Sequence, residues 1–218
     1  PLVGSGGILS FGLFTIPGTY TVVATNPVTG CVTPQAGSAT IAVNPLPVVH
    51  VVTGGGSFCL GGTGVSVGLN GSDPGISYDL MLGGFPVGIT LSGTGGTLNF
   101  GLQIMPGVYT VMATNPLTGC VKNITGSAVV SVTALPYIFN VTGGGNYCAG
   151  GSGVHIGLDA SNTGITYQLY LGSGPVGSSM AGSGGAIDFG LKTVAGSYYV
   201  VATNPLTGCT NIMNGTAL

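Results

Sequence analysis

Cysteine is the reactive side chain that this sequence places most regularly. Cys31, Cys120 and Cys209 each end the motif TNPxTGC, whereas Cys59 and Cys148 follow a Gly-Gly-Gly segment. Cysteines pair as disulfides in oxidising compartments and bind zinc when they occur as Cys-x-x-Cys with nearby ligands. The sequence contains no Cys-x-x-Cys. We therefore expect structural disulfides and an extracellular location, and no zinc site.

Catalysis needs several polar groups in one place, and this sequence supplies few of them. We expect His155 on the outward face of its strand, four residues from Asp159, and no nucleophile-elbow motif accompanies it, so we interpret it as a surface histidine. Calcium-binding repeats use clustered acidic ligands in short runs, and no such run is present. We expect no enzyme activity, no metal and no cofactor. The carboxylates are Asp73, Asp79, Asp159 and Asp188.

Two weaker signals concern nucleotides and sugars. Residues 172–177 match the Gly-x-Gly-x-x-Gly dinucleotide fingerprint by letter, but they open no predicted helix, so we expect a loop. Sugar binding usually relies on exposed aromatic side chains, and the sequence has no tryptophan. We expect Tyr170 and Tyr199 to be ordinary residues of a sheet surface. N-x-[ST] sequences, which matter only in a eukaryotic secretory protein, begin at Asn70, Asn123, Asn140 and Asn214.

The charge content removes two further classes of partner. Only 3% of the 218 residues are charged, the net charge is −2, and Lys122 and Lys192 are the only cations. A nucleic-acid-binding surface needs a basic footprint that neutralises phosphates, so no nucleic acid partner is expected. Glycine, proline and polar residues break every apolar run before the ~18 residues that a membrane helix needs. No membrane insertion is expected.

The chain repeats itself with a period of 89 residues. The three TNPxTGC motifs end at Cys31, Cys120 and Cys209, and 120 − 31 and 209 − 120 both equal 89. A constant period of this kind indicates tandem copies of one structural unit. Phe-Gly pairs keep the same period, at Phe11, Phe100 and Phe189.

On this period the chain divides into three parts. Residues 1–46 are the C-terminal half of a first repeat, 47–135 a complete second repeat, and 136–218 a third repeat that lacks the end of its last strand. Neither end falls at a repeat boundary, so we expect a segment of a longer array. Short proline-containing linkers at 44–47 and 133–136 limit bending. They predict a fairly stiff rod of modules stacked end to end.

Each repeat has the residue pattern of β-strands. Apolar residues alternate with polar or small ones in short runs separated by turn residues, and no window has helical periodicity. The pattern predicts an all-β fold of tandem immunoglobulin-like antiparallel β-sandwich modules, with about seven strands in each repeat. In the second repeat one face of the strands is formed by Val65, Val67, Leu69, Ile76, Tyr78, Leu80, Leu82, Leu98, Phe100, Leu102, Tyr109, Val111, Ala113, Ala128, Val130 and Val132.

Two disulfide schemes fit the cysteine positions, and each leaves one cysteine over. Pairing within a repeat joins Cys59 to Cys120 and Cys148 to Cys209, and leaves Cys31 unpaired. Pairing across the linkers joins Cys31 to Cys59 and Cys120 to Cys148, and leaves Cys209. We favour the first, because it would connect the two sheets of one sandwich. Closing the loop of 120 − 59 = 61 residues would contribute roughly 4 kcal/mol in the chain-entropy model.

The outward positions of the strands are unusual, because Ser, Thr, Gly and Asn stand where Lys and Glu are usual. Near-neutral surfaces promote association, since charge normally keeps soluble proteins apart. Two explanations remain open: the modules pack on copies of themselves in a fibre, or glycan covers their hydroxyl-rich surface. Copies of the same chain are the expected partner, and host or surface glycans are a second candidate.

The segment PGTYTVVATNPVTGC at 17–31 and its copies PGVYTVMATNPLTGC and AGSYYVVATNPLTGC resemble a known hallmark, AGTYTVxVTDxxGC. This hallmark belongs to tandem immunoglobulin-like repeats in very large surface adhesins of Bacteroidota, including gliding-motility adhesins. The resemblance covers every repeat and rests on one strand-and-turn motif, in which Asn-Pro stands where the hallmark often has Asp. It implies bacterial export, by the type IX route, and a role in attachment or filament formation.

These features predict a non-catalytic structural segment of an extracellular bacterial fibre or adhesin, which provides reach, rigidity, attachment and self-association. The alternative is a passive spacer array in a secreted multidomain enzyme or carbohydrate-binding protein. Flanking sequence distinguishes the two: many further 89-residue copies favour the fibre, and a catalytic domain favours the spacer.

Overall fold

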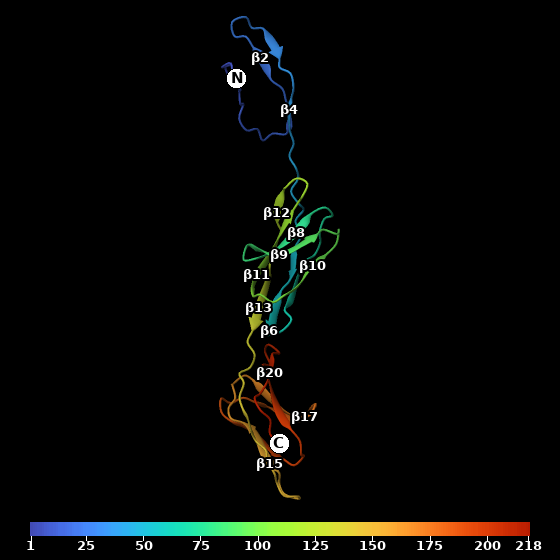
Figure 1. Ribbon diagram of the computed structural model, residues 1–218, viewed down its shortest axis with the longest axis vertical. Coiled ribbons are helices and arrows are strands. Elements are labelled where there is room, and N and C mark those ends of the chain that lie inside the picture. Colours follow the sequence, from blue (N-terminus) through green and yellow to red (C-terminus); the bar gives the residue numbers. More distant parts are fainter.

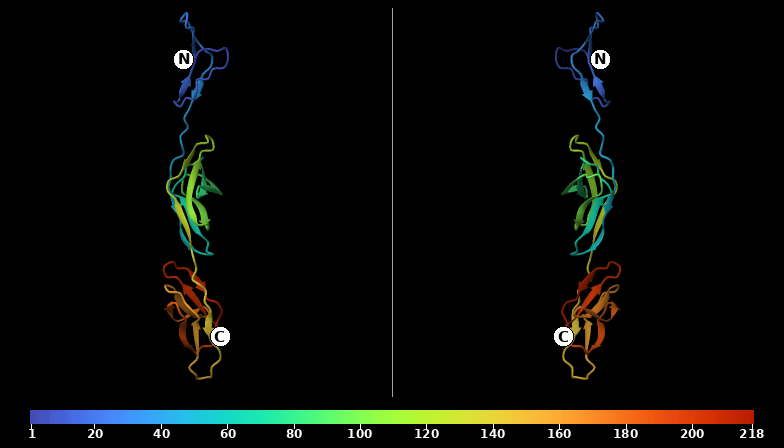
Figure 2. Two further views of the ribbon diagram at one scale, coloured as in Figure 1. Left: turned by 90° about the vertical axis from the view of Figure 1, so that its left-hand side faces the viewer. Right: turned by 90° about the vertical axis from the view of Figure 1, so that its right-hand side faces the viewer.

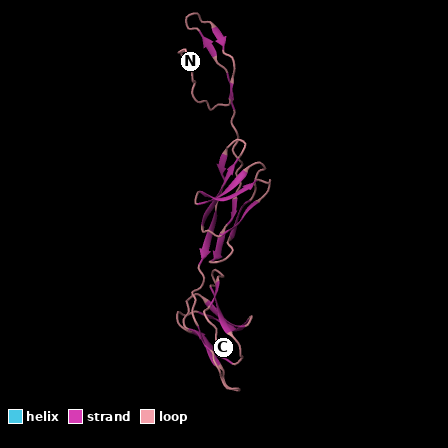
Figure 3. Ribbon diagram, viewed as in Figure 1, coloured by secondary structure: helices cyan, strands magenta, loops and turns pink.

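The computed structural model describes residues 1–218 and consists of strands and loops (Figure 3). The predicted all-β class is confirmed. The sheets fall into three groups, which follow one another along a single long axis in all three views (Figures 1 and 2). The structure has no helix that is long and apolar enough to span a membrane.

The middle group is a sandwich of two sheets. Its strands are β5 (Val52–Gly54), β6 (Gly56–Cys59), β7 (Val65–Leu69), β8 (Ser77–Leu82), β9 (Phe85–Ser92), β10 (Leu98–Gln103), β11 (Gly107–Thr114), β12 (Val121–Asn123) and β13 (Ala128–Thr133). One sheet has the order β10-β7-β5; the other has β6-β13-β11-β8-β9, with β12 paired to β11. Strand β6 runs parallel to β13. This division of strands between two facing sheets is that of an immunoglobulin-like sandwich.

The core of the middle sandwich follows the predicted alternation. Its 13 buried side chains come from both sheets, among them Leu69 from β7 and Val111 from β11. Leu102 was expected inside, but it is 59% exposed, whereas Gln103 is buried. The register of β10 against β7 shifts between Asn99 and Leu102. Such a bulge inserts an extra residue and reverses the faces beyond it. Val132, also expected on the core face, is 36% exposed and is not part of the core.

The C-terminal group is built in the same way. Its strands are β14 (Val141–Gly143), β15 (Val154–Leu158), β16 (Thr166–Leu171), β17 (Gly174–Ala181), β18 (Ile187–Lys192), β19 (Tyr198–Thr203) and β20 (Thr210–Ile212). They form sheets of order β14-β15-β18 and β17-β16-β19-β20, around a core of 10 buried residues. The bounds of β15, β16 and β18 each lie 89 residues after those of β7, β8 and β10.

The N-terminal group has only two short ladders. Its strands are β1 (Gly18–Tyr20), β2 (Val23–Thr25), β3 (Val32–Pro34) and β4 (Ala39–Ile41). Strand β1 pairs with β4 and β2 with β3. The bounds of β3 lie 89 residues before those of β12, and β4 starts 89 residues before β13. The pairing is therefore that of one sheet of the middle sandwich, without the other sheet.

One tyrosine contact recurs in all three groups. Tyr109, near the start of β11, donates its hydroxyl hydrogen to the carbonyl oxygen of Met105 at 2.9 Å. A tyrosine at this place, bonded to the backbone a few residues upstream, is a hallmark of immunoglobulin-like sandwiches. The equivalent bonds join Tyr20 to Ile16 and Tyr198 to Val194.

Candidate functional site: a disulfide-linked junction and an uncovered apolar face

A disulfide crosses the junction between the middle and C-terminal groups. It joins Cys59 to Cys209, whose Cα atoms are 5.5 Å apart and which are 150 residues apart in the sequence. Cys59 is the last residue of β6, and Cys209 immediately precedes β20. Figure 1 shows β6 and β20 at the two ends that face each other. The bond therefore connects two sandwiches and lies inside neither.

The predicted pairs Cys59–Cys120 and Cys148–Cys209 are wrong. Cys120 lies in the turn after β11, which runs antiparallel to β13, and β13 runs parallel to β6. Cys59 and Cys120 therefore lie at opposite ends of one sandwich, roughly 25 Å apart if β11 rises about 3.3 Å per residue. A disulfide requires Cα atoms within about 7 Å. The free cysteines are Cys31, Cys120 and Cys148. Of these three, only Cys31 was predicted to be unpaired.

The TNPxTGC motif forms the turn that positions Cys209. The backbone N–H of Asn204 donates to the carbonyl of Cys209 at 2.8 Å, and that of Gly208 donates to the carbonyl of Asn204 at 2.8 Å. Gly208 has φ +72°, a conformation that glycine adopts without steric cost. The same pair of hydrogen bonds closes the turns at Cys31 and Cys120. All three groups of strands therefore hold a cysteine at the end of the same kind of hairpin.

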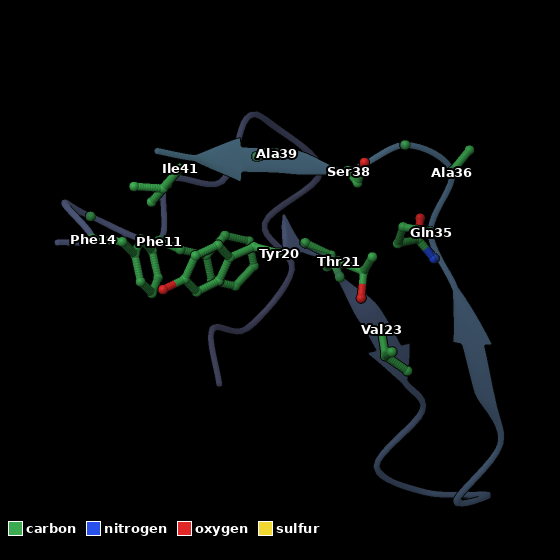
Figure 4. A pocket seen from close by; sticks show the side chains of 13 residues that line it. Phe11, Phe14, Tyr20, Thr21, Val23, Gln35, Ala36, Ser38, Ala39 and Ile41 are labelled. Carbon is green, nitrogen blue, oxygen red and sulfur yellow. The ribbon is translucent and has the colours of Figure 1, made fainter. Parts of the chain in front are cut away.

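An apolar hollow of about 680 Å³ lies in the N-terminal group. In Figure 4 the side chains of Phe11, Phe14, Tyr20 and Ile41 gather on one side of it, beneath Ala39. We call these five residues the uncovered face. The rings of Phe14 and Tyr20 are 4.8 Å apart between centroids. Phe11 and Phe14 are 49% and 47% exposed, so large apolar groups meet solvent here.

The uncovered face is one half of a sandwich core. Four of its residues have counterparts one period later that are at most 5% exposed: Phe100, Tyr109, Ala128 and Val130. In the middle group these counterparts pack in one cluster with Leu69 of β7 and Leu80 of β8. Strands of that kind are absent from the N-terminal group. The hollow therefore lies where strands equivalent to β7 and β8 would pack, and its lining contains no histidine, cysteine or carboxylate.

Each histidine lies beside an aspartate. The partner of His155, however, is not Asp159, the aspartate four residues along the chain. His155 is 64% exposed, as expected for a surface histidine, and its Nδ1 lies 2.7 Å from Asp188 Oδ2. Asp159 accepts hydrogen bonds from Asn140 instead. His50 Nε2 lies 3.2 Å from Asp73 Oδ2. Neither histidine has a hydroxyl or thiol group as a hydrogen-bond partner, so no nucleophile is positioned beside them.

Hydrogen bonds hold the pKa of two exposed aspartates below its usual range. For Asp188 the main cause is the backbone N–H of Gly190, with His155 contributing. For Asp159 it is the side-chain amide of Asn140, followed by the backbone N–H of the same residue. These are local bonds to single carboxylates. No three His, Cys, Asp or Glu side chains lie together as a metal site would require. The expectation that the chain binds no metal stays a prediction.

The glycine-rich segment at 172–177 and the tyrosines Tyr170 and Tyr199 lie in the strands and turns of the C-terminal group. Gly172 and Ser173 form the turn between β16 and β17, whereas 174–177 belong to strand β17. The expected loop at 172–177 is therefore wrong beyond Ser173, and no helix begins there. Tyr170 and Tyr199 are directly opposite each other on β16 and β19, and their rings stack with centroids 5.3 Å apart. The sequence placed both on an outward face but did not predict the pairing. Cross-strand aromatic pairs of this kind stabilise sheets.

No protein-family model and no curated protein matches this sequence. Among solved structures, the human OSCAR ligand-binding domain is similar, with 13% sequence identity and a TM-score of 0.34 over 80% of this chain and 98% of that chain.

Proposed function

We propose that this chain is a non-catalytic structural segment of an extracellular, cell-surface fibre or adhesin. It is an array of tandem immunoglobulin-like repeats of 89 residues, with repeat boundaries at 46/47 and 135/136. Its partners are copies of itself. A bacterial surface is the proposed setting, on the strength of the strand-and-turn motif described above. No enzyme activity, cofactor or nucleic acid enters the proposal.

The observation that carries this proposal is the bond between Cys59 and Cys209. A passive spacer only has to keep other domains apart, and the polypeptide itself already connects its units. Such a spacer does not need a second covalent link across each junction. A second link fixes the angle between neighbouring units, which is the property required of a rigid stalk. A disulfide also requires an oxidising compartment, in keeping with an extracellular location.

The surface supports self-association. The two sandwiches carry all six charged side chains of the chain, so long stretches of their sheets present only neutral groups. Near-neutral surfaces associate because little repulsion holds them apart. A contact that forms between two repeats also recurs every 89 residues, and weak contacts repeated along a rod add up. Such contacts depend little on ion pairs and should persist in high salt.

Sedimentation and negative-stain electron microscopy of the purified, glycan-free chain test the proposal. We expect rods that associate side by side or end to end, and association that is unchanged between low and about molar salt. The variant Phe11→Ser/Phe14→Ser is the matched control, because it removes exposed apolar groups from the uncovered face without touching either sandwich. Association that survives this change belongs to the sheet surfaces. Monomers at every concentration and salt would refute self-association and favour the spacer alternative.

A further inference from the structure

The observed disulfide follows the register of the repeat. Cys59 is 61 residues from Cys120 and 150 residues from Cys209, and 150 − 61 = 89. The bond thus joins the cysteine that follows the Gly-Gly-Gly segment of one repeat to the hairpin cysteine of the next. We call these the strand cysteines, Cys59 and Cys148, and the hairpin cysteines, Cys31, Cys120 and Cys209. Among the five cysteines, only Cys59 has a hairpin cysteine 150 residues after it, and that cysteine, Cys209, is its partner.

At the junction between the N-terminal group and the middle sandwich, the hairpin cysteine is placed as Cys209 is at the next junction. Sγ of Cys120 lies 3.9 Å from the carbonyl oxygen of Asn44. Asn44 is one period before Thr133, which is the residue paired with Cys59 in the β6–β13 ladder. Cys120 therefore lies beside the chain position where a strand cysteine of the preceding repeat would pair. Residues 1–46 contain no strand cysteine.

The other two free cysteines are positioned like the bonded pair. The turn after Cys148 is closed by a hydrogen bond from the N–H of Gly151 to the carbonyl of Cys148 at 2.8 Å, and Cys59 accepts the same bond from Gly62 at 2.8 Å. Cys31 ends a hairpin that is closed by the same two backbone hydrogen bonds as the hairpin of Cys209. Both Cys148 and Cys31 are exposed. They lie in the C-terminal and N-terminal groups, which are at opposite ends of the long axis (Figure 2).

We propose that each strand cysteine bonds to the hairpin cysteine of the next unit along the array, so that Cys148 bonds to the hairpin cysteine of the unit that follows it. Between two copies of this chain that partner is Cys31 of the second copy, and the copies link end to end with the geometry of the Cys59–Cys209 junction. The inference rests on the proposed repeat array. Two protein S–H bonds break and one S–S bond forms. The S–S bond of a disulfide oxidant such as oxidised glutathione breaks, accepts the two electrons and takes up the two protons as two thiols. Cys120 does not take part in this link, because it lies beside Asn44 at a junction inside the chain.

The test is oxidation of the concentrated chain in a glutathione buffer, followed by non-reducing electrophoresis and peptide mapping by mass spectrometry. We expect a ladder of covalent multimers, with Cys148–Cys31 as the linking peptide pair and Cys59–Cys209 retained in every copy. A mixture of isotope-labelled and unlabelled chains should give Cys148–Cys31 pairs with one labelled partner. Cys148→Ser should abolish the ladder, whereas Cys120→Ser, the matched control, should leave it intact.

Three results would overturn the inference: linking pairs of two strand cysteines, a statistical mixture of all free cysteines, or no covalent multimers. Sedimentation of the same sample in reductant separates this inference from the proposed function. Association in reductant without a ladder in oxidant would refute the end link alone. A ladder in oxidant with only monomers in reductant would refute non-covalent self-association alone.

Discussion

The hydroxyl oxygen of Tyr78 accepts a hydrogen bond from the backbone N–H of Asp73 at 2.9 Å. The contact recurs one period later, where Tyr167 accepts from the N–H of Asn162 at 2.9 Å. Both tyrosine side chains are fully buried. In each sandwich, a tyrosine of the core thus holds the loop that leads into its own strand.

Replacing Tyr78 with phenylalanine should destabilise the middle sandwich, because the N–H of Asp73 loses its partner. We expect the free energy of unfolding to fall by about 1–2 kcal/mol, in the range for a buried donor left unpaired. Tyr167→Phe should have the same effect on the C-terminal sandwich. Urea denaturation measures both. Tyr137→Phe, at a side chain that is 77% exposed, is the control; an equal loss there would contradict the argument.

Alkaline pH should also destabilise the fold through its tyrosines. Burial is the main cause that raises the pKa of Tyr78, and the only one that raises that of Tyr109, above the ordinary value of 10.0. A raised pKa means that the neutral form is favoured in the folded state. Its stabilising effect is complete below about pH 10 and is lost as pH rises through the folded pKa. Ultraviolet absorbance of tyrosinate and circular dichroism should therefore change together above pH 10; ionisation without unfolding would refute this coupling.

Gly93 is required by a close backbone approach. A Cβ atom there would lie 1.9 Å from the carbonyl oxygen of Asp73, and one at Gly182 would lie 1.9 Å from that of Asn162. Because backbone atoms cannot rotate away, we expect Gly93→Ala to cost at least about 1–3 kcal/mol of stability. Gly96→Ala is the matched control, since its nearest neighbour is 3.8 Å away. Comparable melting temperatures for the two variants would contradict the steric argument.

Reduction of the Cys59–Cys209 bond should destabilise both sandwiches. Cys59 lies beside Thr133 in the middle sandwich, so unfolding of the C-terminal sandwich alone leaves a closed loop of 209 − 133 = 76 residues. Asn211, close to Cys209, donates to the carbonyl of Pro136 at 2.9 Å, so unfolding of the middle sandwich alone leaves a closed loop of 136 − 59 = 77 residues. The chain-entropy model assigns roughly 4 kcal/mol to a loop of this length. Calorimetry with and without reductant should show both transitions at lower temperature.

Single substitutions make this prediction sharper. Cys59→Ser should lower both transitions as reductant does, although the substituted residue belongs to one sandwich. Cys31→Ser should change neither, because Cys31 is free. A bond within one sandwich would affect the melting temperature of that sandwich alone. If Cys59→Ser lowers only one of the two transitions, the bond does not stabilise both sandwiches and the prediction is wrong.

Alternation in the sequence predicted most of the strands whose residues reach the core, but not β5, whose Val52 is buried there. Strands β7, β8, β10 and β11 lie where apolar residues alternate. The prediction missed β9, because its residues Pro86 and Gly88 are unfavourable in strands and it packs only at the sheet edge. It also misplaced Leu102, since Gly101 permits a bulge (φ +83°) that the residue pattern does not reveal.

The disulfide pairing could not be derived from the period. Separations of 61 and 150 residues differ by one repeat, so the sequence pattern is the same whether a strand cysteine pairs within its own unit or with the next. The choice depends on which end of the sandwich each cysteine occupies. The prediction required Cys59 and Cys120 to face each other on the two sheets of one sandwich, whereas Cys59 ends β6 at the junction. Knowledge of the parallel β6–β13 ladder was needed to see this.

That ladder has a consequence for a chain under tension. Strand β6 belongs to the segment by which the polypeptide enters the middle sandwich, and β13 is the strand by which it leaves, and the two are paired in parallel over four residues. While the Cys59–Cys209 bond is intact, it carries a pull along the long axis from Cys59 to Cys209 and shields the residues between them. Once that bond is reduced, the same pull drives β6 and β13 past each other in shear. Their backbone hydrogen bonds then bear the load together, whereas strands pulled apart from one end lose their bonds one at a time.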